Sequence, residues 1–166
     1  AVFTGAGISR DQPSNLPLWP DLVNNLVRDL ARTDPKRRYD QIVETLIARK
    51  LPSEVVIQFI AGYDKPTCKQ AVADVFAGAV PNRHHHRLAA LASRISVFVT
   101  TNYDDCQEQA LRARGIEFKL LISDSDFLWA SEALANKTLR TPVVAKIHGH
   151  LEQSSGMVMM LSESRR

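Results

Sequence analysis

Short apolar segments that alternate with helical patterns are the feature that most constrains the fold of this chain. The expected strands cover Val2–Phe3, 95–100, 118–122 and 143–147. The helical patterns that accompany the last three strands cover 83–93, 104–114 and 124–135. Short apolar strands separated by helices are typical of a mostly parallel sheet with helices on both faces. The sequence therefore predicts an α/β, Rossmann-like fold.

A purely helical stretch interrupts this alternation. Apolar residues at helical spacing predict a helix over 20–31, followed by helices over 40–50, 53–61 and 67–78. Ser53 and Thr67 stand where N-caps belong, and Gly62 and Gly78 stand where helices stop. We interpret the region from about 35 to 80 as a helical insertion within the domain.

Composition excludes several classes of protein. The 166 residues are 45% hydrophobic, which argues against disorder. The 21 Lys and Arg exceed the 18 Asp and Glu by only 21 − 18 = 3, so nucleic-acid binding is not indicated. No apolar run approaches the ~18 residues of a membrane span. Cys68 and Cys106 form no CxxC, so neither a disulfide framework nor a zinc knuckle is indicated. We expect a cytoplasmic protein with no membrane partner.

The two ends of the sequence predict a piece of a longer protein. Ala1 leads at once into an apolar run, and a strand expected over 157–161 is followed by only five residues. We therefore expect one domain over 1–166, with additional domains in the same chain.

Three expected strands end in polar or glycine-rich segments. These are Thr-Gly-Ala-Gly-Ile-Ser (4–9), Thr-Thr-Asn-Tyr-Asp (100–104) and Lys-Ile-His-Gly (146–149). In open α/β sheets, ligands bind beyond the carboxyl ends of the strands. If the sheet is parallel, the three segments converge at one edge and form a candidate site.

The residue types in these segments suit nucleotide chemistry, although each has a structural alternative. Gly5 and Gly7 would let backbone amides approach a pyrophosphate, but Arg10 replaces the third glycine of the dinucleotide fingerprint, and a structural turn is an equal alternative. Asn102 and Asp104 could hold an amide or a sugar hydroxyl, or one of them could cap the next helix. His148 is a candidate proton acceptor, and its place opposite the other two segments favours that role over a structural one.

Metal binding is not predicted. His84, His85 and His86 occupy consecutive helix positions, which point about 100° apart and cannot converge on one ion. Cys106 follows two aspartates at an expected helix start, and we interpret it as a buried residue.

Four motifs in order resemble the Sir2, or sirtuin, NAD-binding domain. They are Gly-Ala-Gly-Ile-Ser (5–9), Pro-Asn-x-x-His-x-x-Leu-x-x-Leu (81–91), Thr-Thr-Asn-Tyr-Asp (100–104) and Lys-Ile-His-Gly (146–149). Sirtuins usually read Thr-Gln-Asn-Ile-Asp at the third motif, and Gly-Ile-Pro-Asp-Phe-Arg where this chain has Leu-Pro-Leu-Trp (16–19). Both departures resemble the Sir2-like domains of bacterial antiphage defence NADases.

The resemblance implies a role for each matching residue. Asn102 would face the nicotinamide ribose, Asp104 would bind the carboxamide and His148 would act as general base, so that Asn102 and His148 form the catalytic pair. His85 matches a helix histidine best explained as a structural hydrogen-bonding residue. The cofactor-binding set implied by the family is Gly5, Ala6, Gly7, Ser9, Thr100, Asn102 and Asp104.

The four-cysteine zinc module of sirtuin deacylases has no counterpart here, because no cysteine follows Gly149 in this sequence. Water is then the natural acceptor, so the resemblance implies hydrolysis of NAD+, used as substrate and without a metal, to nicotinamide and ADP-ribose. An NAD-dependent protein deacylase and a non-catalytic NAD or ADP-ribose sensor are the alternatives. A homo-oligomer is compatible with all three.

Overall fold

The computed structural model describes residues 1–33, 41, 44–45, 48–62 and 65–150. The helix expected over 40–50 lies partly outside these residues, and the strand expected over 157–161 lies wholly outside them.

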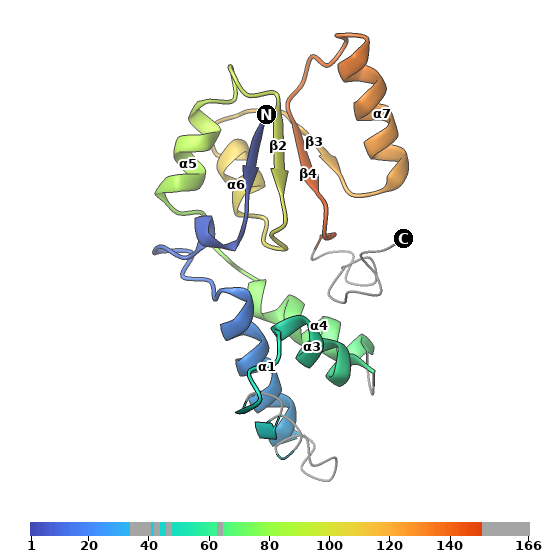
Figure 1. Cartoon of the computed structure of the whole chain (residues 1–166). Helices are drawn as coiled ribbons and strands as arrows, with labels where there is room; N and C mark the ends of the chain where they lie inside the picture. Colours follow the sequence, from blue (N-terminus) through green and yellow to red (C-terminus); the bar gives the residue numbers. More distant parts are fainter. Residues whose placement is uncertain (34–40, 42–43, 46–47, 63–64, 151–166) are drawn as a thin grey trace.

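Four parallel strands form the sheet of the described chain, in the order β1-β2-β4-β3 (Figure 1). The strands are β1 (Val2–Thr4), β2 (Val97–Thr100), β3 (Lys119–Leu121) and β4 (Val143–Lys146). The predicted α/β fold with a parallel sheet is confirmed, and each strand lies within two residues of its expected bounds.

Helices cover both faces of the sheet. On one face, Phe98 and Val144 pack against α5 (Arg83–Ala90) and α6 (Cys106–Arg112). On the other face, Val143 and Ala145 pack against α7 (Asp124–Ala135). Successive residues of β2 and β4 point to opposite faces, as the pleat of a strand requires. All four residues of β4 are buried, because this central strand is covered on both sides.

Three further helices form a helical unit beyond the carboxyl ends of the strands (Figure 1). They are α1 (Trp19–Thr33), α3 (Ser53–Ala61) and α4 (Lys65–Phe76). Leu22, Val23, Leu26 and Val27 form the buried stripe of α1 that packs in this unit. The helical insertion is therefore confirmed, and α1, which precedes it in the chain, packs against its helices α3 and α4.

Two of the expected N-caps were wrong, although α3 covers its expected range. Ser53 is the first residue of α3, whose N-cap is Pro52 with a φ of −54°, and Thr67 lies inside α4. A proline lies at the start of both helices. Pro52 is the N-cap of α3, and Pro66 is the second residue of α4, where its fixed φ suits the first turn of a helix. Gly62 caps α3 as expected, and Gly78 adopts a φ of +74° just beyond α4. No helix among the residues described is both long and apolar enough to cross a bilayer.

Candidate functional site

The carboxyl ends of β1, β2 and β4 meet at one edge of the sheet. Thr4 is in register with Thr100, and Thr100 is in register with Lys146. Beyond the strands, the Thr101 N–H donates to the Thr4 carbonyl over 3.3 Å, and the Ile147 N–H donates to the Thr100 carbonyl over 3.1 Å. The predicted convergence is confirmed. We call the segments 4–9, 100–104 and 146–149 the site rim.

The glycine loop enters the rim through a 3-10 turn, η1 (Ala6–Ser9). A Cβ on Gly5 would lie 3.4 Å from Thr101 Oγ1, whereas a Cβ on Gly7 would meet nothing within 4 Å. Gly5 has a φ of −138°, so neither a left-handed backbone nor a steric clash requires glycine at this position in the ligand-free protein. Gly7 leaves open surface at the edge where the strands end.

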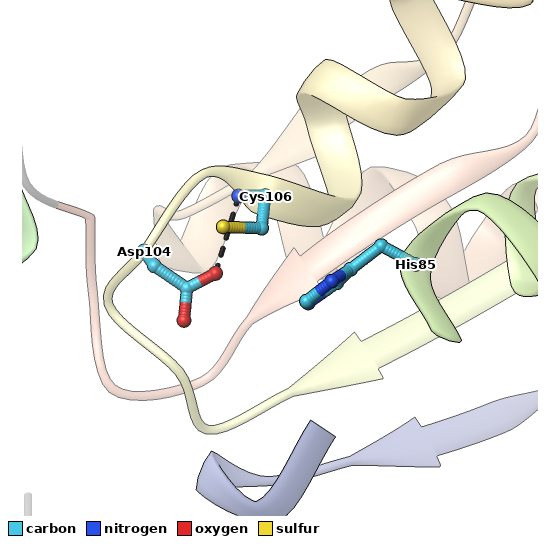
Figure 2. A group of neighbouring side chains, drawn as sticks. All are labelled: His85, Asp104 and Cys106. Carbon is cyan, nitrogen blue, oxygen red and sulfur yellow. Dashed lines mark hydrogen bonds between the residues drawn. The ribbon is translucent and has the colours of Figure 1, made fainter. Parts of the chain in front are cut away.

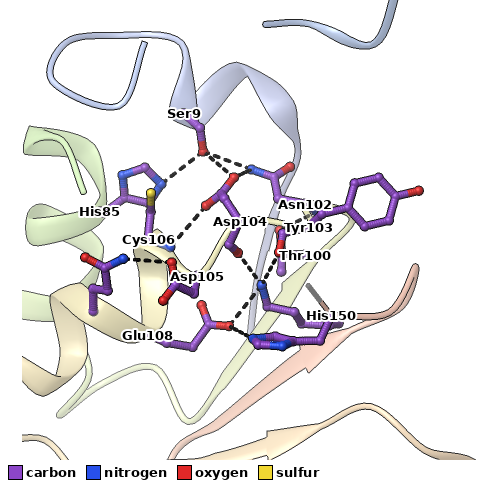
Figure 3. Close-up of polar contacts among 12 residues, drawn as sticks. Ser9, His85, Thr100, Asn102, Tyr103, Asp104, Asp105, Cys106, Glu108 and His150 are labelled. Atoms are coloured by element: carbon purple, nitrogen blue, oxygen red, sulfur yellow. Dashed lines mark hydrogen bonds and ion pairs between the residues drawn. The ribbon is translucent and has the colours of Figure 1, made fainter. Parts of the chain in front are cut away.

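Ser9 is the centre of a buried hydrogen-bond network (Figure 3). Its Oγ donates to Asp104 Oδ2 over 2.9 Å and accepts from Asn102 Nδ2 over 3.1 Å. His85 Nε2 lies 3.2 Å from the same oxygen. Two of the three rim segments, 4–9 and 100–104, thus meet α5 at one hydroxyl.

The protonation of His85 follows from its two neighbours. The Asn82 N–H donates to His85 Nδ1 over 3.1 Å, so a neutral ring carries its proton on Nε2 and donates it to Ser9. Burial lowers the pKa of His85 more than the nearby Asp104 raises it, which favours the neutral ring. These contacts agree with the structural hydrogen-bonding role expected for His85.

Asp104 both caps a helix and faces the network. Its Oδ1 accepts from the Cys106 N–H at the start of α6 over 3.1 Å, and its Oδ2 accepts from Ser9 and from Asn102 Nδ2, the latter over 3.2 Å. The capping alternative therefore holds for Asp104. It does not exclude a ligand, because a carboxylate can exchange one of its hydrogen-bond donors for another.

Asn102 presents an unused acceptor in this network. Its side-chain nitrogen donates twice, while its Oδ1 is buried and has no hydrogen-bond partner among the described residues. An unsatisfied buried acceptor costs about 1–3 kcal/mol, which a donor from a ligand or a water would recover. Thr100 supports this arrangement, because its Oγ1 accepts from the Asn102 N–H over 3.0 Å.

His148 lies in the turn after β4, half-buried beside Tyr103. The two ring centroids are 6.4 Å apart. Burial lowers the pKa of His148, so the imidazole is neutral at neutral pH, as a proton acceptor must be.

Tyr103 extends these ring contacts to the helical unit. Its ring centroid lies 6.3 Å from that of Trp19 on α1 and 5.8 Å from that of Phe76 on α4. Tyr103 and Trp19 belong to the two segments that depart from the usual sirtuin pattern. The structure thus brings both departures into one aromatic cluster.

Sequence reasoning missed an ionic cluster beneath the rim. Lys146, Glu108 and His150 are all buried, and Lys146 Nζ lies 2.9 Å from Glu108 Oε1. His150 Nε2 lies 3.7 Å from the same carboxylate oxygen. The sequence feature that could have indicated this cluster is a lysine at the end of an apolar strand. Nothing in the sequence pairs that lysine with a glutamate on α6.

His85, Asp104 and Cys106 bring three potential metal ligands within 4.8 Å of one another (Figure 2). Burial and the neighbouring Asp104 carboxylate raise the pKa of the Cys106 thiol, which disfavours the thiolate that a metal requires. The other two groups are joined through Ser9. We interpret the three residues as hydrogen-bonding partners.

His84 instead contacts Asp11 over 3.0 Å and His86 is exposed, so the three consecutive histidines diverge as expected.

Comparison with known proteins supports the resemblance. Residues 96–165 match the family model described as SIR2-like domain. The chain is also 28% identical, over 163 residues and 98% of its length, to the NAD(+) hydrolase ThsA of Cytobacillus dafuensis. The chain spans 29% of the length of that relative. Residues 96–165 thus resemble a SIR2-like domain, and the parallel sheet with the motifs at its carboxyl edge agrees with that resemblance.

Proposed function

We propose that this domain binds NAD+ at the site rim and hydrolyses it to nicotinamide and ADP-ribose. The observation that carries the proposal is the buried Asn102 Oδ1, which has no hydrogen-bond partner among the described residues. Asn102 lies beside Asp104 in the loop after β2, and the neighbouring strand β4 leads to His148. The similarity to an NAD(+) hydrolase supports the same chemistry.

The glycine loop would hold the phosphates and the adjoining ribose through Gly5, Ala6, Gly7 and Ser9. The open surface beside Gly7 allows a phosphate to approach the backbone there. The Asp104 carboxylate would accept an N–H of the nicotinamide carboxamide in place of one of its present donors. Thr100 would act on the ligand through the backbone of Asn102, whose N–H it fixes.

In the reaction, the bond between nicotinamide nitrogen and ribose C1′ breaks, and its electron pair leaves with nicotinamide. A water oxygen then forms the new bond to C1′, and the water proton passes to His148 and on to solvent. The Asn102 Oδ1 would accept a hydrogen bond from that water or from a ribose hydroxyl, which positions the attack on the oxocarbenium-like centre. We further propose that this NAD+ consumption serves bacterial antiphage defence, as the sequence resemblance implies.

The decisive experiment measures NAD+ consumption by the complete natural protein, with nicotinamide and ADP-ribose separated chromatographically. Asn102→Ala and His148→Ala should each abolish nicotinamide release, while Glu132→Gln on the exposed face of α7 should not change it. Addition of EDTA should leave turnover unchanged, because no metal takes part.

The alternatives give different results in the same assay. Nicotinamide release that requires an acyl-lysine peptide would establish a deacylase and overturn hydrolysis. Binding of NAD+ or ADP-ribose without turnover, with or without the peptide, would indicate a sensor. Calorimetric titration with ADP-ribose supplies that binding measurement, and absence of binding would contradict the site itself.

A further inference from the structure

Lys146 occupies a position that is unusual for a lysine. It is the last residue of β4, and its side chain is 0% exposed. Its ammonium group contacts Glu108 Oε1 over 2.9 Å, the Tyr103 carbonyl over 3.3 Å and the Asp104 carbonyl. Three oxygens thus meet the three donors of the ammonium.

Stability alone does not account for this arrangement. Burying two charges removes their hydration, and the attraction between them often fails to offset that cost, so that apolar replacements of similar size are frequently neutral or stabilising. Glu108 shows the cost directly, because burial raises its pKa even though the Lys146 charge lowers it. The contacts of the ammonium with the two backbone carbonyls therefore indicate the role of Lys146 better than the ion pair does.

The two carbonyls belong to the rim segment that carries the proposed binding residues. Tyr103 lies between Asn102 and Asp104, and its ring lies beside the ring of His148. Lys146 itself precedes His148 by two residues on the neighbouring strand. One ammonium group therefore ties the segment that bears Asn102 and Asp104 to the strand that leads to His148.

We propose that Lys146 is a positioning residue, which fixes the 100–104 segment against the end of β4 so that Asn102, Asp104 and His148 keep their relative geometry, with Glu108 as its counter-ion. The catalytic part of this inference rests on the proposed hydrolysis of NAD+. The positioning itself is a property of the ligand-free protein and is measurable without substrate.

The competing interpretation is that the pair only fills the space under the rim. A double variant separates the two interpretations. Lys146→Met with Glu108→Leu removes both charges and keeps side chains of similar size. It therefore leaves neither charge buried without its partner, but the Tyr103 and Asp104 carbonyls lose the ammonium donor. Glu108→Gln alone keeps an oxygen for the ammonium and leaves those donors in place.

The experiment uses the complete natural protein with five variants: the double variant, Lys146→Met, Glu108→Gln, and the exposed controls Lys137→Met and Glu132→Gln. Hydrogen–deuterium exchange is followed by mass spectrometry without ligand, together with the melting temperature and the kcat and KM for NAD+. We expect the double variant to melt near the wild-type temperature, to exchange faster in peptides covering 100–106 and not in peptides of α7, and to lose kcat by about 100-fold. Glu108→Gln should exchange more slowly over 100–106 than the double variant and keep more of its kcat, because the ammonium still donates to both carbonyls.

Unchanged exchange over 100–106 in a folded double variant would overturn the positioning role, whatever its activity. Faster exchange with kcat intact would overturn the link from Lys146 to catalysis. If the wild-type protein neither binds nor turns over NAD+, the proposed function fails, and the exchange measurement still decides whether Lys146 orders the segment. If the double variant does not fold, Glu108→Gln is compared with Lys146→Met. An equal loss of exchange protection or of kcat in the two single variants would contradict the proposal. Protection and kcat that are retained in Glu108→Gln but lost in Lys146→Met would support it.

Discussion

Ser9 and Asp104 are 95 residues apart in the chain, yet the Ser9 hydroxyl donates to Asp104 Oδ2 over 2.9 Å in a buried environment. This hydrogen bond joins the loop after β1 to the loop after β2. The same hydroxyl oxygen also meets Asn102 and His85, so a single atom links the glycine loop, the β2 loop and α5.

Replacement of Ser9 should therefore be costly. In Ser9→Ala, the donors of His85 and Asn102 lose their shared acceptor inside the protein, and each unsatisfied buried group costs about 1–3 kcal/mol. We expect a drop in the free energy of unfolding of at least this size, measured by urea denaturation. Ser131→Ala, on the exposed side of α7, is the matched control and should be near neutral. Equal stability of the two variants would contradict the network.

Burial of neutral His85 predicts a pH dependence of stability. The pKa of His85 in the folded chain lies below its ordinary value of 6.5, chiefly through desolvation. As the pH falls through 6.5, the unfolded chain binds a proton that the folded chain does not, so the free energy of unfolding decreases. Between about pH 7.5 and 5.5 this decrease should be smaller in His85→Gln than in the wild type. The exposed His86→Gln should keep the wild-type slope, and a His85→Gln slope equal to it would refute the assignment.

Both cysteines should resist modification in the native protein. Cys68 and Cys106 are free thiols with 1% and 0% exposure. At Cys106, burial and the Asp104 carboxylate also raise the pKa, so the reactive thiolate is scarce. Ellman's reagent should react slowly with the native chain and rapidly after unfolding in urea. The single-cysteine variants Cys68→Ala and Cys106→Ala assign the reaction to one thiol, and rapid native labelling of Cys106 would show that the thiol is accessible.

The sequence predicted the sheet and the convergence of its edge because both follow from local patterns. Apolar strands separated by helices require parallel pairing, and polar residues directly after three strands must then share one edge. These local patterns do not predict which residues from distant elements contact one another. The Lys146–Glu108 pair joins a strand to a helix across the interior, and the place of α1 in the helical unit depends on packing with α3 and α4. The helix α4 begins before the N-cap expected at Thr67, because Pro66 is favoured in the first turn of a helix.

The aromatic cluster around Tyr103 should couple the helical unit to the rim. Tyr103→Ala removes the ring that contacts Trp19, Phe76 and His148, and truncation of a buried aromatic residue costs about 3–5 kcal/mol. Tyr103→Phe keeps the ring and should retain most of the stability. Thermal unfolding of both variants measures the difference. A Tyr103→Ala variant as stable as Tyr103→Phe would show that the ring contacts contribute little.

The acid side of the pH–activity profile should report His148. If His148 accepts the proton of the attacking water, only its neutral form is active, and turnover falls as the ring becomes protonated. Because burial lowers the pKa of His148, the midpoint of that fall in kcat for NAD+ should lie below 6.5. The residual activity of His148→Gln should not change through the same range, while the exposed His86→Gln should follow the wild type. Melting temperatures taken at each pH separate loss of the fold from loss of the base. A midpoint above 6.5, or an acid limb that persists in folded His148→Gln, would assign the proton transfer to another group.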